Sequence, residues 1–341
     1  MKAVVIERPG AVALRELDPP VCGPDDVVVR SRAAGVCRTD LEVLRGELDL
    51  RWVRYPCVPG HEWSGEIAEV GAAVDGLAVG DRVVCEGMIP CRHCRRCAAG
   101  DTNLCENYDQ LGFTRIGGYG ELVLAPACVV HRLPDHVGFD EAVLVEPASV
   151  VLRALERARL SASEAVGVIG VGTLGSLAVL LARLGGAERV VAYGVREEEL
   201  ELARKLGADE AVDVSGGNPA VAGLDVFVET AGAVPAVELA TRLVREGGRV
   251  VLLGIAGEGK TLAALPADRI ALRDLELIGS VGYTSAVWSR VVELLHEGRL
   301  DLAPIVTHRF PLAEFERAFD LMEHREGIVA KIVLEHEPPP P

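Results

Sequence analysis

Strands and helices alternate along the middle of the chain, and this alternation restricts the possible folds more than any other feature. The run AVGVIGVG predicts a buried strand, SLAVLLARLG a helix, RVVAYGV a second strand and EEELELARKLG a second helix. The pattern continues through DEAVDV, DVFVETAG, PAVELATRLVREG and RVVLLGIAG. Short apolar strands separated by helices at this spacing indicate βαβ units, in which helices cover both faces of a parallel sheet. We therefore predict an α/β fold with a doubly wound parallel sheet.

The segments on either side of this region have a different pattern. In the first third, β-branched runs separated by Pro and Gly predict strands at MKAVVIE, DDVVVRSRAAGV, SGEIAEVG and GDRVVCEG. Near the end, SAVWSRVVELLHEGRL and LAEFERAFDLMEHR predict amphipathic helices, and GIVAKIVLE predicts a last strand. The sequence thus predicts a domain over 147–284 inserted into a β-rich domain made of 1–146 and 285–341. The final EHEPPPP is expected to be irregular.

Charge and composition exclude several classes of partner. The 341 residues, 49% of them apolar, suffice for two packed domains, and 35 basic against 51 acidic side chains give a net charge of −16. This excess argues against nucleic acids and anionic membrane surfaces, which bind Lys and Arg. The start MKAVVIERPG lacks a secretory leader pattern, and the uncharged run 165–182 contains glycines that suit a strand, turn and helix better than a membrane span. We expect a cytoplasmic protein that acts on a small molecule.

A glycine-rich turn follows the first strand of the alternating region. It has the pattern G-x-G-x-x-G, and its residues are Gly170, Gly172, Thr173, Leu174 and Gly175. The first glycine permits a tight turn, the second lets the backbone approach a pyrophosphate, and the third lets the helix pack on the strand. The helix N-terminus then faces the anion. In this context the turn predicts dinucleotide binding, although glycine-rich turns also occur without it.

The end of the next predicted strand indicates which dinucleotide is bound. An Asp or Glu commonly accepts hydrogen bonds from the adenosine ribose there, but this chain has Gly194, and Arg196 follows. A carboxylate would repel a 2′-phosphate, whereas Arg can pair with it. NADP(H) is therefore favoured over NAD(H). The nearby Glu197 and Glu198 leave open the alternative that Arg196 is an ordinary solvated arginine.

Nine cysteines are present, and four of them are closely spaced. The pattern Cys91-x2-Cys94-x2-Cys97-x7-Cys105 can bring four thiolates together in a tetrahedron around Zn²⁺, with no open position for chemistry. We predict a structural zinc site here, because the alternative would place four reactive free thiols on one polar loop.

A second group of candidate metal ligands is dispersed along the chain. Cys37, His61, Glu62 and Glu146 combine a soft, a borderline and two hard ligands, a set that suits a catalytic zinc with an open position. Spacing alone does not establish such a site. A single Cys is more often a small core residue, and a His-Glu pair is more often structural.

Several motifs together give the chain a resemblance to a known family. Gly60-His61-Glu62-x2-Gly65-x5-Gly71-x2-Val74, the four-cysteine segment, the Gly170 turn, Ile278-Gly279-Ser280, Thr307-His308 and Lys331-Ile332-Val333 occur in that order. The chain resembles the zinc-dependent medium-chain alcohol and polyol dehydrogenases along nearly its whole length. The resemblance implies a GroES-like β-barrel catalytic domain, a Rossmann-type NAD(P)-binding domain and an active site in the cleft between them.

The resemblance also implies roles for individual residues. Cys37 and His61 correspond to catalytic zinc ligands, and Glu62 or Glu146 completes the set in the sorbitol, threonine and butanediol dehydrogenase branch, which this chain resembles by its Glu146. Thr39 corresponds to the residue that passes the substrate proton outward. Residues that correspond to pyrophosphate contacts are Arg38 and Lys331.

The chain departs from the family pattern at two positions. Glu42 replaces a His that often continues the proton relay, and Arg92 replaces the Gly usual after the first cysteine of the structural zinc site. Two segments, YPCVPGHEWSG and LCENYDQLGFTRIGGYGELV, resemble the 2-deoxy-scyllo-inosamine dehydrogenases. This likeness is local and is only a hint about the substrate.

The expected activity is reversible oxidation of a secondary alcohol of the polyol, amino alcohol or cyclitol type with NADP(H), in a homodimer or homotetramer that holds two zinc ions per chain. Three alternatives remain open. They are an NADPH-dependent carbonyl reductase, an NAD-dependent threonine or butanediol dehydrogenase, and a non-catalytic NADP(H)-binding protein.

Overall fold

The structure is a computed structural model that describes residues 1–337 apart from 218, 220 and 258. Contacts between Cα atoms divide the chain into two compact units. Unit 1 consists of Met1–Glu146 and Tyr283–Pro341, and unit 2 of Pro147–Gly282. The inserted segment therefore ends two residues before the predicted boundary at residue 284. In the described part of the chain, no helix is long and apolar enough to cross a membrane.

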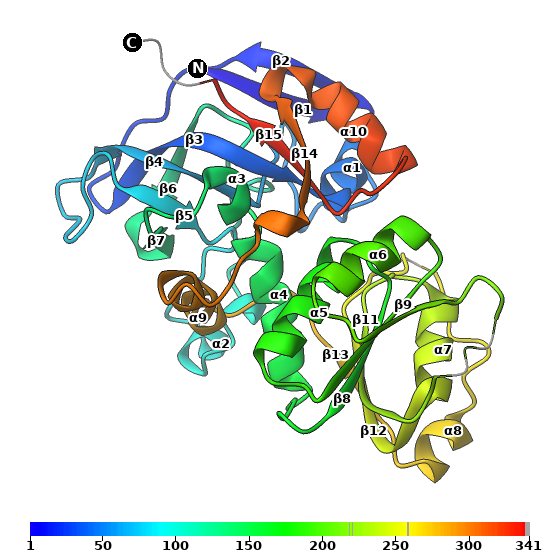
Figure 1. The fold of residues 1–341 in the computed structure, drawn as a ribbon. Helices are drawn as coiled ribbons and strands as arrows, with labels where there is room; N and C mark the ends of the chain where they lie inside the picture. Colours follow the sequence, from blue (N-terminus) through cyan, green and yellow to red (C-terminus); the bar gives the residue numbers. More distant parts are fainter. Residues whose placement is uncertain (218, 220, 258, 338–341) are drawn as a thin grey trace. The chain divides into compact units, whose positions relative to one another are not determined.

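Unit 2 contains a parallel sheet covered by helices on both faces (Figure 1). In spatial order its six strands are β10 (Glu210–Asp213), β9 (Arg189–Gly194), β8 (Ala165–Ile169), β11 (Leu224–Glu229), β12 (Val244–Leu252) and β13 (Glu276–Gly279). Its helices are α5 (Thr173–Leu184), α6 (Glu197–Lys205), α7 (Val234–Leu243) and α8 (Ala267–Leu272). Figure 1 shows α5 and α6 on one face of this sheet and α7 on the other. The predicted doubly wound α/β arrangement is confirmed.

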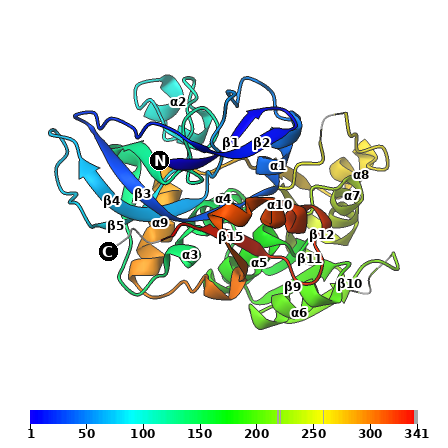
Figure 2. The same ribbon diagram turned by 90° about the horizontal axis from the view of Figure 1, so that it is seen from above.

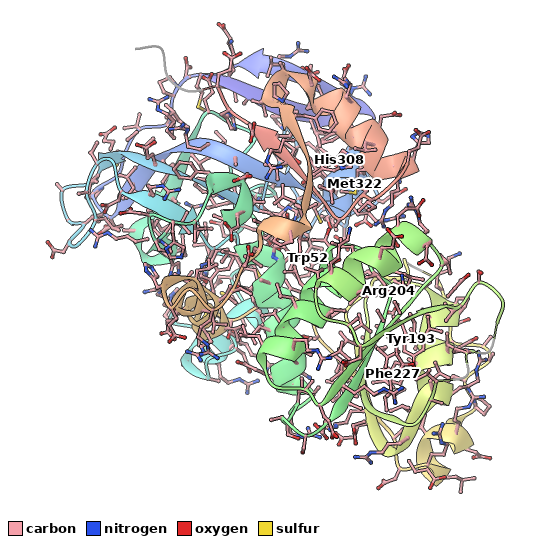
Figure 3. All side chains as sticks on the ribbon, viewed as in Figure 1. Trp52, Tyr193, Arg204, Phe227, His308 and Met322 are labelled. Carbon is pink, nitrogen blue, oxygen red and sulfur yellow. The ribbon has the colours of Figure 1, made fainter. Side chains whose placement is uncertain are left out.

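The central strands of this sheet are apolar because both faces are covered. Four of the five residues of β8 and all but the first of β9 are buried. Within the core, the rings of Tyr193 and Phe227 lie 5.6 Å apart between centroids (Figure 3), and the Tyr193 hydroxyl donates to the carbonyl of Val221 at 3.0 Å.

Unit 1 is built on a mixed sheet in which most strands are antiparallel neighbours. Its strands are β14 (Val306–Pro311), β15 (Lys331–Glu335), β3 (Asp26–Val36), β4 (Trp63–Val70), β5 (Arg82–Cys85) and β7 (Val130–Arg132) in spatial order, with β6 (Leu122–Pro126) paired to β3. Figure 2 shows β3, β4 and β5 side by side, with α10 (Phe315–His324) alongside β15. The remaining elements are the hairpin β1 (Lys2–Arg8) and β2 (Ala11–Glu16) and the helices α1 (Arg38–Arg45), α2 (Arg95–Ala98), α3 (Phe139–Ala142) and α9 (Ser285–His296), while α4 (Val145–Arg157) begins here and continues into unit 2.

Two details of the predicted secondary structure are wrong. The helix expected over PAVELATRLVREG ends at Leu243, because β12 begins at Val244 and pairs there with Leu224. The C-terminal segment is ordered further than expected: Glu335 is the last residue of β15, and the buried His336 donates from Nε2 to the Gly118 carbonyl at 2.8 Å. The closing prolines at 338–341 lie outside the described residues.

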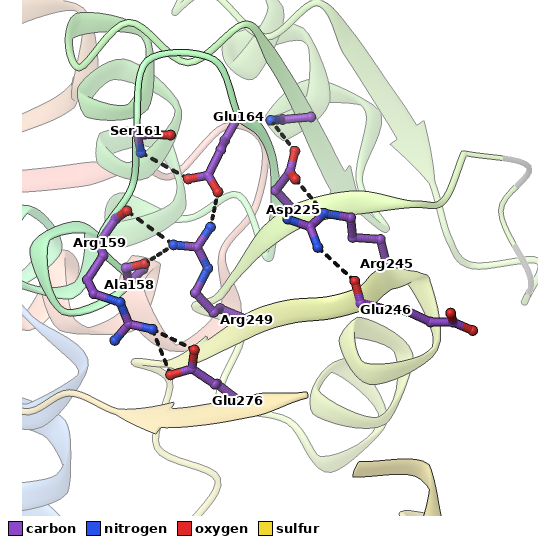
Figure 4. A network of polar contacts seen from close by, with 10 residues as sticks. Ala158, Arg159, Ser161, Glu164, Asp225, Arg245, Glu246, Arg249 and Glu276 are labelled. Carbon is purple, nitrogen blue, oxygen red and sulfur yellow. Dashed lines mark hydrogen bonds and ion pairs between the residues drawn. The ribbon is translucent and has the colours of Figure 1, made fainter. Parts of the chain in front are cut away.

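A polar network ties together the elements at the amino ends of the unit 2 strands (Figure 4). Arg249, on β12, pairs with Glu164 and donates to the carbonyls of Ala158 and Arg159 beyond the end of α4. Nearby, Arg159 donates to both carboxylate oxygens of Glu276 on β13. The side chains of Arg249 and Glu164 are only 10% and 16% exposed, so solvent screens their pairing little.

Replacing Arg249 with Ala removes the partner of Glu164 and leaves two backbone carbonyls without that donor. We expect the free energy of unfolding, measured with urea, to fall by about 3 kcal/mol. The matched control is Arg204→Ala, which removes a more exposed ion pair to Glu197 in the same unit. Its effect should be much smaller, since exposed pairs stabilise proteins little. Equal losses in the two variants would contradict a stabilising role of the buried Arg249–Glu164 pair.

Candidate active site

Strand pairing brings together three of the predicted metal ligands. Cys37 follows the end of β3, and His61 and Glu62 directly precede β4, which runs antiparallel to β3 with Ala34 opposite Trp63. The end of one strand therefore lies beside the start of the other. A backbone hydrogen bond from Gly35 to the Glu62 carbonyl, at 2.7 Å, continues this pairing.

The three side chains form a compact group that suits a metal ion. One potential ligand atom from each of Cys37, His61 and Glu62 lies within 4.8 Å of the others. Burial alone would lower the pKa of His61, but Asp40 and Cys37 beside it outweigh burial and raise that pKa well above its usual value. The thiol, imidazole and carboxylate are ligands that zinc takes, and a divalent cation would offset the negative charge gathered here. The residues present therefore fit a zinc ion.

A buried carboxylate stands behind His61. Asp40, on the first turn of α1, accepts from the Cys37 backbone N–H through Oδ2 at 2.9 Å, and its Oδ1 lies 3.6 Å from His61 Nδ1. The Tyr119 hydroxyl donates to the same Oδ2 at 2.9 Å. Neither Asp40 nor Tyr119 was among the candidate residues from the sequence. Asp40 had a local signal, its position three residues after the cap residue of a helix, whereas Tyr119 had none.

Lys331 lies beside this group, at the start of β15. Because β15 pairs antiparallel to β3 with Ile332 opposite Val36, Lys331 reaches the level of Cys37. Its side chain is 2% exposed, and its ammonium group contacts the Glu62 carboxylate and donates to the Val36 carbonyl at 3.3 Å. Lys331 therefore forms a buried ion pair within unit 1, and its contact with the cofactor pyrophosphate stays a prediction.

Glu146, the other candidate carboxylate, stands at the start of α4 and is not among the three residues whose ligand atoms lie within 4.8 Å of one another. Burial raises the pKa of Glu146 to about 7, and the neighbouring Glu62 contributes to the shift, against the opposing effect of His61. Glu146 therefore lies close enough to interact electrostatically with His61 and Glu62, but it is not part of the compact group of three ligands.

The residues predicted to move the substrate proton lie on the first turns of α1. Thr39 Oγ1 is 3.7 Å from Cys37 Sγ, and both side chains are half-buried. One turn later, Glu42 is half-buried and faces the exposed Arg38 at 3.6 Å. The helix therefore places Thr39 beside Cys37, while the half-buried Glu42 lies one turn later next to the exposed Arg38.

The four closely spaced cysteines converge as a second group. The sulfur atoms of Cys91, Cys94, Cys97 and Cys105 lie within 4.8 Å of one another, with 4.0 Å between Cys91 and Cys97. A tetrahedron with Zn–S bonds of about 2.3 Å has sulfur atoms about 3.8 Å apart. Hydrogen bonds from the Asn107 amide and the His93 backbone lower the pKa of Cys91 to about 5, so its thiolate is favoured. This group also fits zinc.

Arg92, which departs from the family pattern, stands at a position suited to glycine. Its φ of 63° is in the left-handed region, where a side chain costs about 1–2 kcal/mol. The guanidinium donates to the Cys128 carbonyl at 2.7 Å, a contact that glycine could not make.

In unit 2, the glycine-rich turn joins β8 to α5 as predicted from its spacing. Gly170 has φ 88°, and a Cβ there would lie 2.7 Å from the Ala231 backbone nitrogen. A Cβ on Gly175 would collide with the carbonyl oxygen of Gly170. Gly172 caps the helix that Thr173 and Leu174 begin, and the cap makes no side-chain hydrogen bond. Backbone N–H groups at this helix end can therefore face an anion.

Gly194 is the last residue of β9, and Arg196 is the cap residue of α6. A Cβ on Gly194 would lie 3.1 Å from Leu200 Cδ2 and 3.3 Å from Val171 Cγ2, so a larger residue would crowd apolar neighbours. The Arg196 side chain is 28% exposed and lies 3.9 Å from Glu199.

Each of the two units contains a region that matches a known protein family. Residues 23–135 match the alcohol dehydrogenase GroES-like domain, and residues 173–297 match the zinc-binding dehydrogenase domain. Curated relatives include L-threonine 3-dehydrogenases of Rhizobium johnstonii, 36% identical over 98% of both chains, and of Proteus mirabilis, 34% identical over 96% of this chain and 97% of that one.

Solved structures show the same architecture. A zinc-binding dehydrogenase of Sinorhizobium meliloti 1021 bound to NADP has a TM-score of 0.91 at 32% identity, with 98% of each chain covered. Galactitol-1-phosphate dehydrogenase of Escherichia coli has a TM-score of 0.88 at 30% identity and covers 98% of this chain and 100% of that chain.

Fold and site together define an oxidoreductase enzyme with a GroES-like domain and a Rossmann-type domain. The chain belongs to the zinc-dependent medium-chain dehydrogenase family.

In the zinc-free protein, replacing Lys331 with Met leaves Glu62 buried without its cationic partner. We expect the free energy of unfolding to fall by about 3–5 kcal/mol, because an unpaired buried carboxylate is strongly destabilising. Urea unfolding of the purified variant measures this loss. The exposed Lys205→Met is the control and should have little effect. A Lys331→Met protein as stable as this control would contradict the buried pair.

Proposed function

We propose that the protein reversibly transfers a hydride between a secondary alcohol and NADP(H), with zinc bound by Cys37, His61 and Glu62. The observation that carries the proposal is the convergence of these three side chains beside Thr39. A non-catalytic binding protein would have no need for that set. The positions of the atoms favour Glu62 over Glu146 as the third protein ligand.

Zinc at this group would supply Lewis acidity, which lowers the pKa of an alcohol hydroxyl toward neutrality. The nicotinamide ring of the cofactor would accept or donate the hydride. A second zinc, held by the four cysteines, would have only a structural role, since four thiolates leave no open position.

The protein side chains would manage the proton that leaves the alcohol. Thr39 Oγ1 would hydrogen-bond the substrate hydroxyl and pass its proton outward. Glu42 lies one turn further along α1 and next to the exposed Arg38, so it is the candidate next acceptor in place of the histidine usual in the family. Oε1 of Glu42 lies 3.6 Å from Nε of the exposed Arg38 on the same helix.

The preference for NADP(H) is proposed from the end of β9. Gly194 supplies no carboxylate to repel a 2′-phosphate, and Arg196, the cap residue of α6, follows two residues later. The pyrophosphate would bind at the N-terminus of α5, where Gly170, Gly172 and Gly175 keep the backbone accessible. That the similar Sinorhizobium meliloti structure holds NADP agrees with this preference.

The substrate class is proposed from the relatives. L-threonine and galactitol 1-phosphate, in the names of two similar proteins, both carry a secondary hydroxyl beside another polar group. We propose a polyol, amino alcohol or cyclitol as substrate of this chain, which we expect to act as a homodimer or homotetramer in the cytoplasm. An NAD-dependent threonine-type dehydrogenase is the second candidate, because several of the curated relatives are named L-threonine 3-dehydrogenase.

The proposed catalytic zinc is tested by measuring the zinc content and the activity of the wild type and of Cys37→Ser. The wild type should hold two zinc ions per chain and Cys37→Ser one, with alcohol oxidation reduced about 1,000-fold or more, equivalent to about 4 kcal/mol of transition-state stabilisation. Binding of cofactor, followed by fluorescence, should persist. Cys22→Ser is the control, since Cys22 lies outside both groups. A Cys37→Ser protein that lacks this zinc and turns over at the wild-type rate would refute the mechanism.

Arg196→Ala tests the cofactor preference. Loss of a charged hydrogen-bonding partner should weaken NADPH binding about 10- to 100-fold, equivalent to about 1.5–3 kcal/mol, and leave NADH binding within about twofold. Titration calorimetry with both cofactors measures this difference, and Arg204→Ala in the same helix is the control. Equal weakening of both cofactors would mean that Arg196 does not recognise a 2′-phosphate.

A further inference from the structure

Tyr119 has a buried hydroxyl close to the candidate catalytic group that the proposed mechanism does not use. The residue lies between β5 and β6, shortly before Leu122, and its side chain is 0% exposed. Burial, followed by the nearby charge of Asp40, raises its pKa well above the usual value, so the phenol remains protonated and acts as a donor.

The hydroxyl of Tyr119 and the cap of α1 share one oxygen of Asp40. Tyr119 donates to Oδ2 at 2.9 Å, and the Cys37 backbone N–H donates to the same oxygen at 2.9 Å. The terminal torsion of an Asp side chain is soft, so two donors on one oxygen largely fix the orientation of the carboxylate. The other oxygen, Oδ1, is then directed toward His61 Nδ1, 3.6 Å away.

His61 is constrained from a second direction. Its ring stacks on Phe113 with 4.8 Å between centroids and 30° between planes. Stacking fixes the plane of a ring but permits rotation within it, whereas a carboxylate opposite Nδ1 fixes that rotation. Within the described residues, Nδ1 and Asp40 Oδ1 have no hydrogen-bond partner, so each is available to the other. Nε2 is then the nitrogen left for a metal.

We propose that Tyr119 is a positioning residue, whose hydroxyl orients Asp40 so that Asp40 in turn orients His61 toward the metal. This inference rests on the proposed zinc site at Cys37, His61 and Glu62. Groups that hold metal-ligating histidines commonly change metal affinity 10- to 100-fold when replaced. Tyr119 contacts the metal ligand His61 only through Asp40. We therefore expect its hydroxyl to change the rate of zinc release about 3- to 10-fold.

The alternative role for Tyr119 is to fill the core. Its backbone accepts from Val4 N–H at 3.1 Å and donates to the Pro59 carbonyl at 3.0 Å, and its ring lies 6.2 Å from that of Phe319. Tyr119→Phe keeps all of these contacts and removes only the hydroxyl. The variant therefore separates the positioning role from the packing role.

The experiment measures release of zinc from purified holoenzyme to a colorimetric chelator in excess. Two kinetic phases of zinc release are expected, one for each site. The phase that is missing in Cys37→Ser belongs to the catalytic zinc, and the zinc held by Cys91, Cys94, Cys97 and Cys105 is an internal reference. Tyr119→Phe should lose the catalytic zinc about 3- to 10-fold faster and the other zinc at the wild-type rate. Tyr193→Phe, which removes a buried hydroxyl from the core of unit 2, should change neither rate.

Substitution with Co²⁺ gives a second readout, since its visible spectrum reports the geometry of the ligands. The d–d bands of the Cys37 site should shift in Tyr119→Phe and not in Tyr193→Phe. An unchanged release rate and spectrum would overturn the inference. A wild-type protein with no zinc phase assigned to Cys37 would instead refute the proposed function, so the two failures are distinguishable.

Discussion

The antiparallel pairing of β3 with both β4 and β15 is the constraint on which the candidate active site depends. It places the end of one strand beside the starts of two others, and so brings Cys37, His61, Glu62 and Lys331 to one level of the sheet. Backbone hydrogen bonds fix this register, and a shift by one residue would turn each side chain to the opposite face. The geometry of the ligands is therefore a property of the sheet more than of any loop.

Buried charge is the second constraint on this region. Glu62 and Asp40 are both almost fully buried, and an isolated buried carboxylate is very costly. Each has a different kind of partner: Glu62 has the ammonium of Lys331, while Asp40 has a backbone N–H and the Tyr119 hydroxyl. Asp40 Oδ1 alone is left for the imidazole of His61. The polar groups around the ligands thus leave few orientations for them, which is the condition for a rigid metal site.

The sequence was informative where function depends on local spacing. Four cysteines within one loop and three glycines at a strand–helix turn specify their geometry over a few residues, and the structure brings both sets together. Long-range pairing was not accessible in this way. Tyr119 and Asp40 are 79 positions apart in the sequence, and Lys331 and Glu62 are 269 positions apart. No periodic pattern in the sequence predicts either contact. The cofactor contact of Lys331 is implied by the family resemblance, and nothing in the sequence signals that this side chain is buried beside Glu62.

The net charge of the chain does not predict the charge at each candidate site. The chain carries −16, yet the two candidate sites handle charge in opposite ways. The group around Cys37 contains the buried carboxylates of Asp40 and Glu62 and only one buried lysine, so its acidic side chains outnumber the basic one, which suits a cation. The turn at Gly170 uses no side chain, because the neutral N–H groups at the start of α5 and their dipole suffice to attract an anion. A strongly acidic protein can therefore offer a binding site to an anion, since the backbone N–H groups supply the positive end of the interaction.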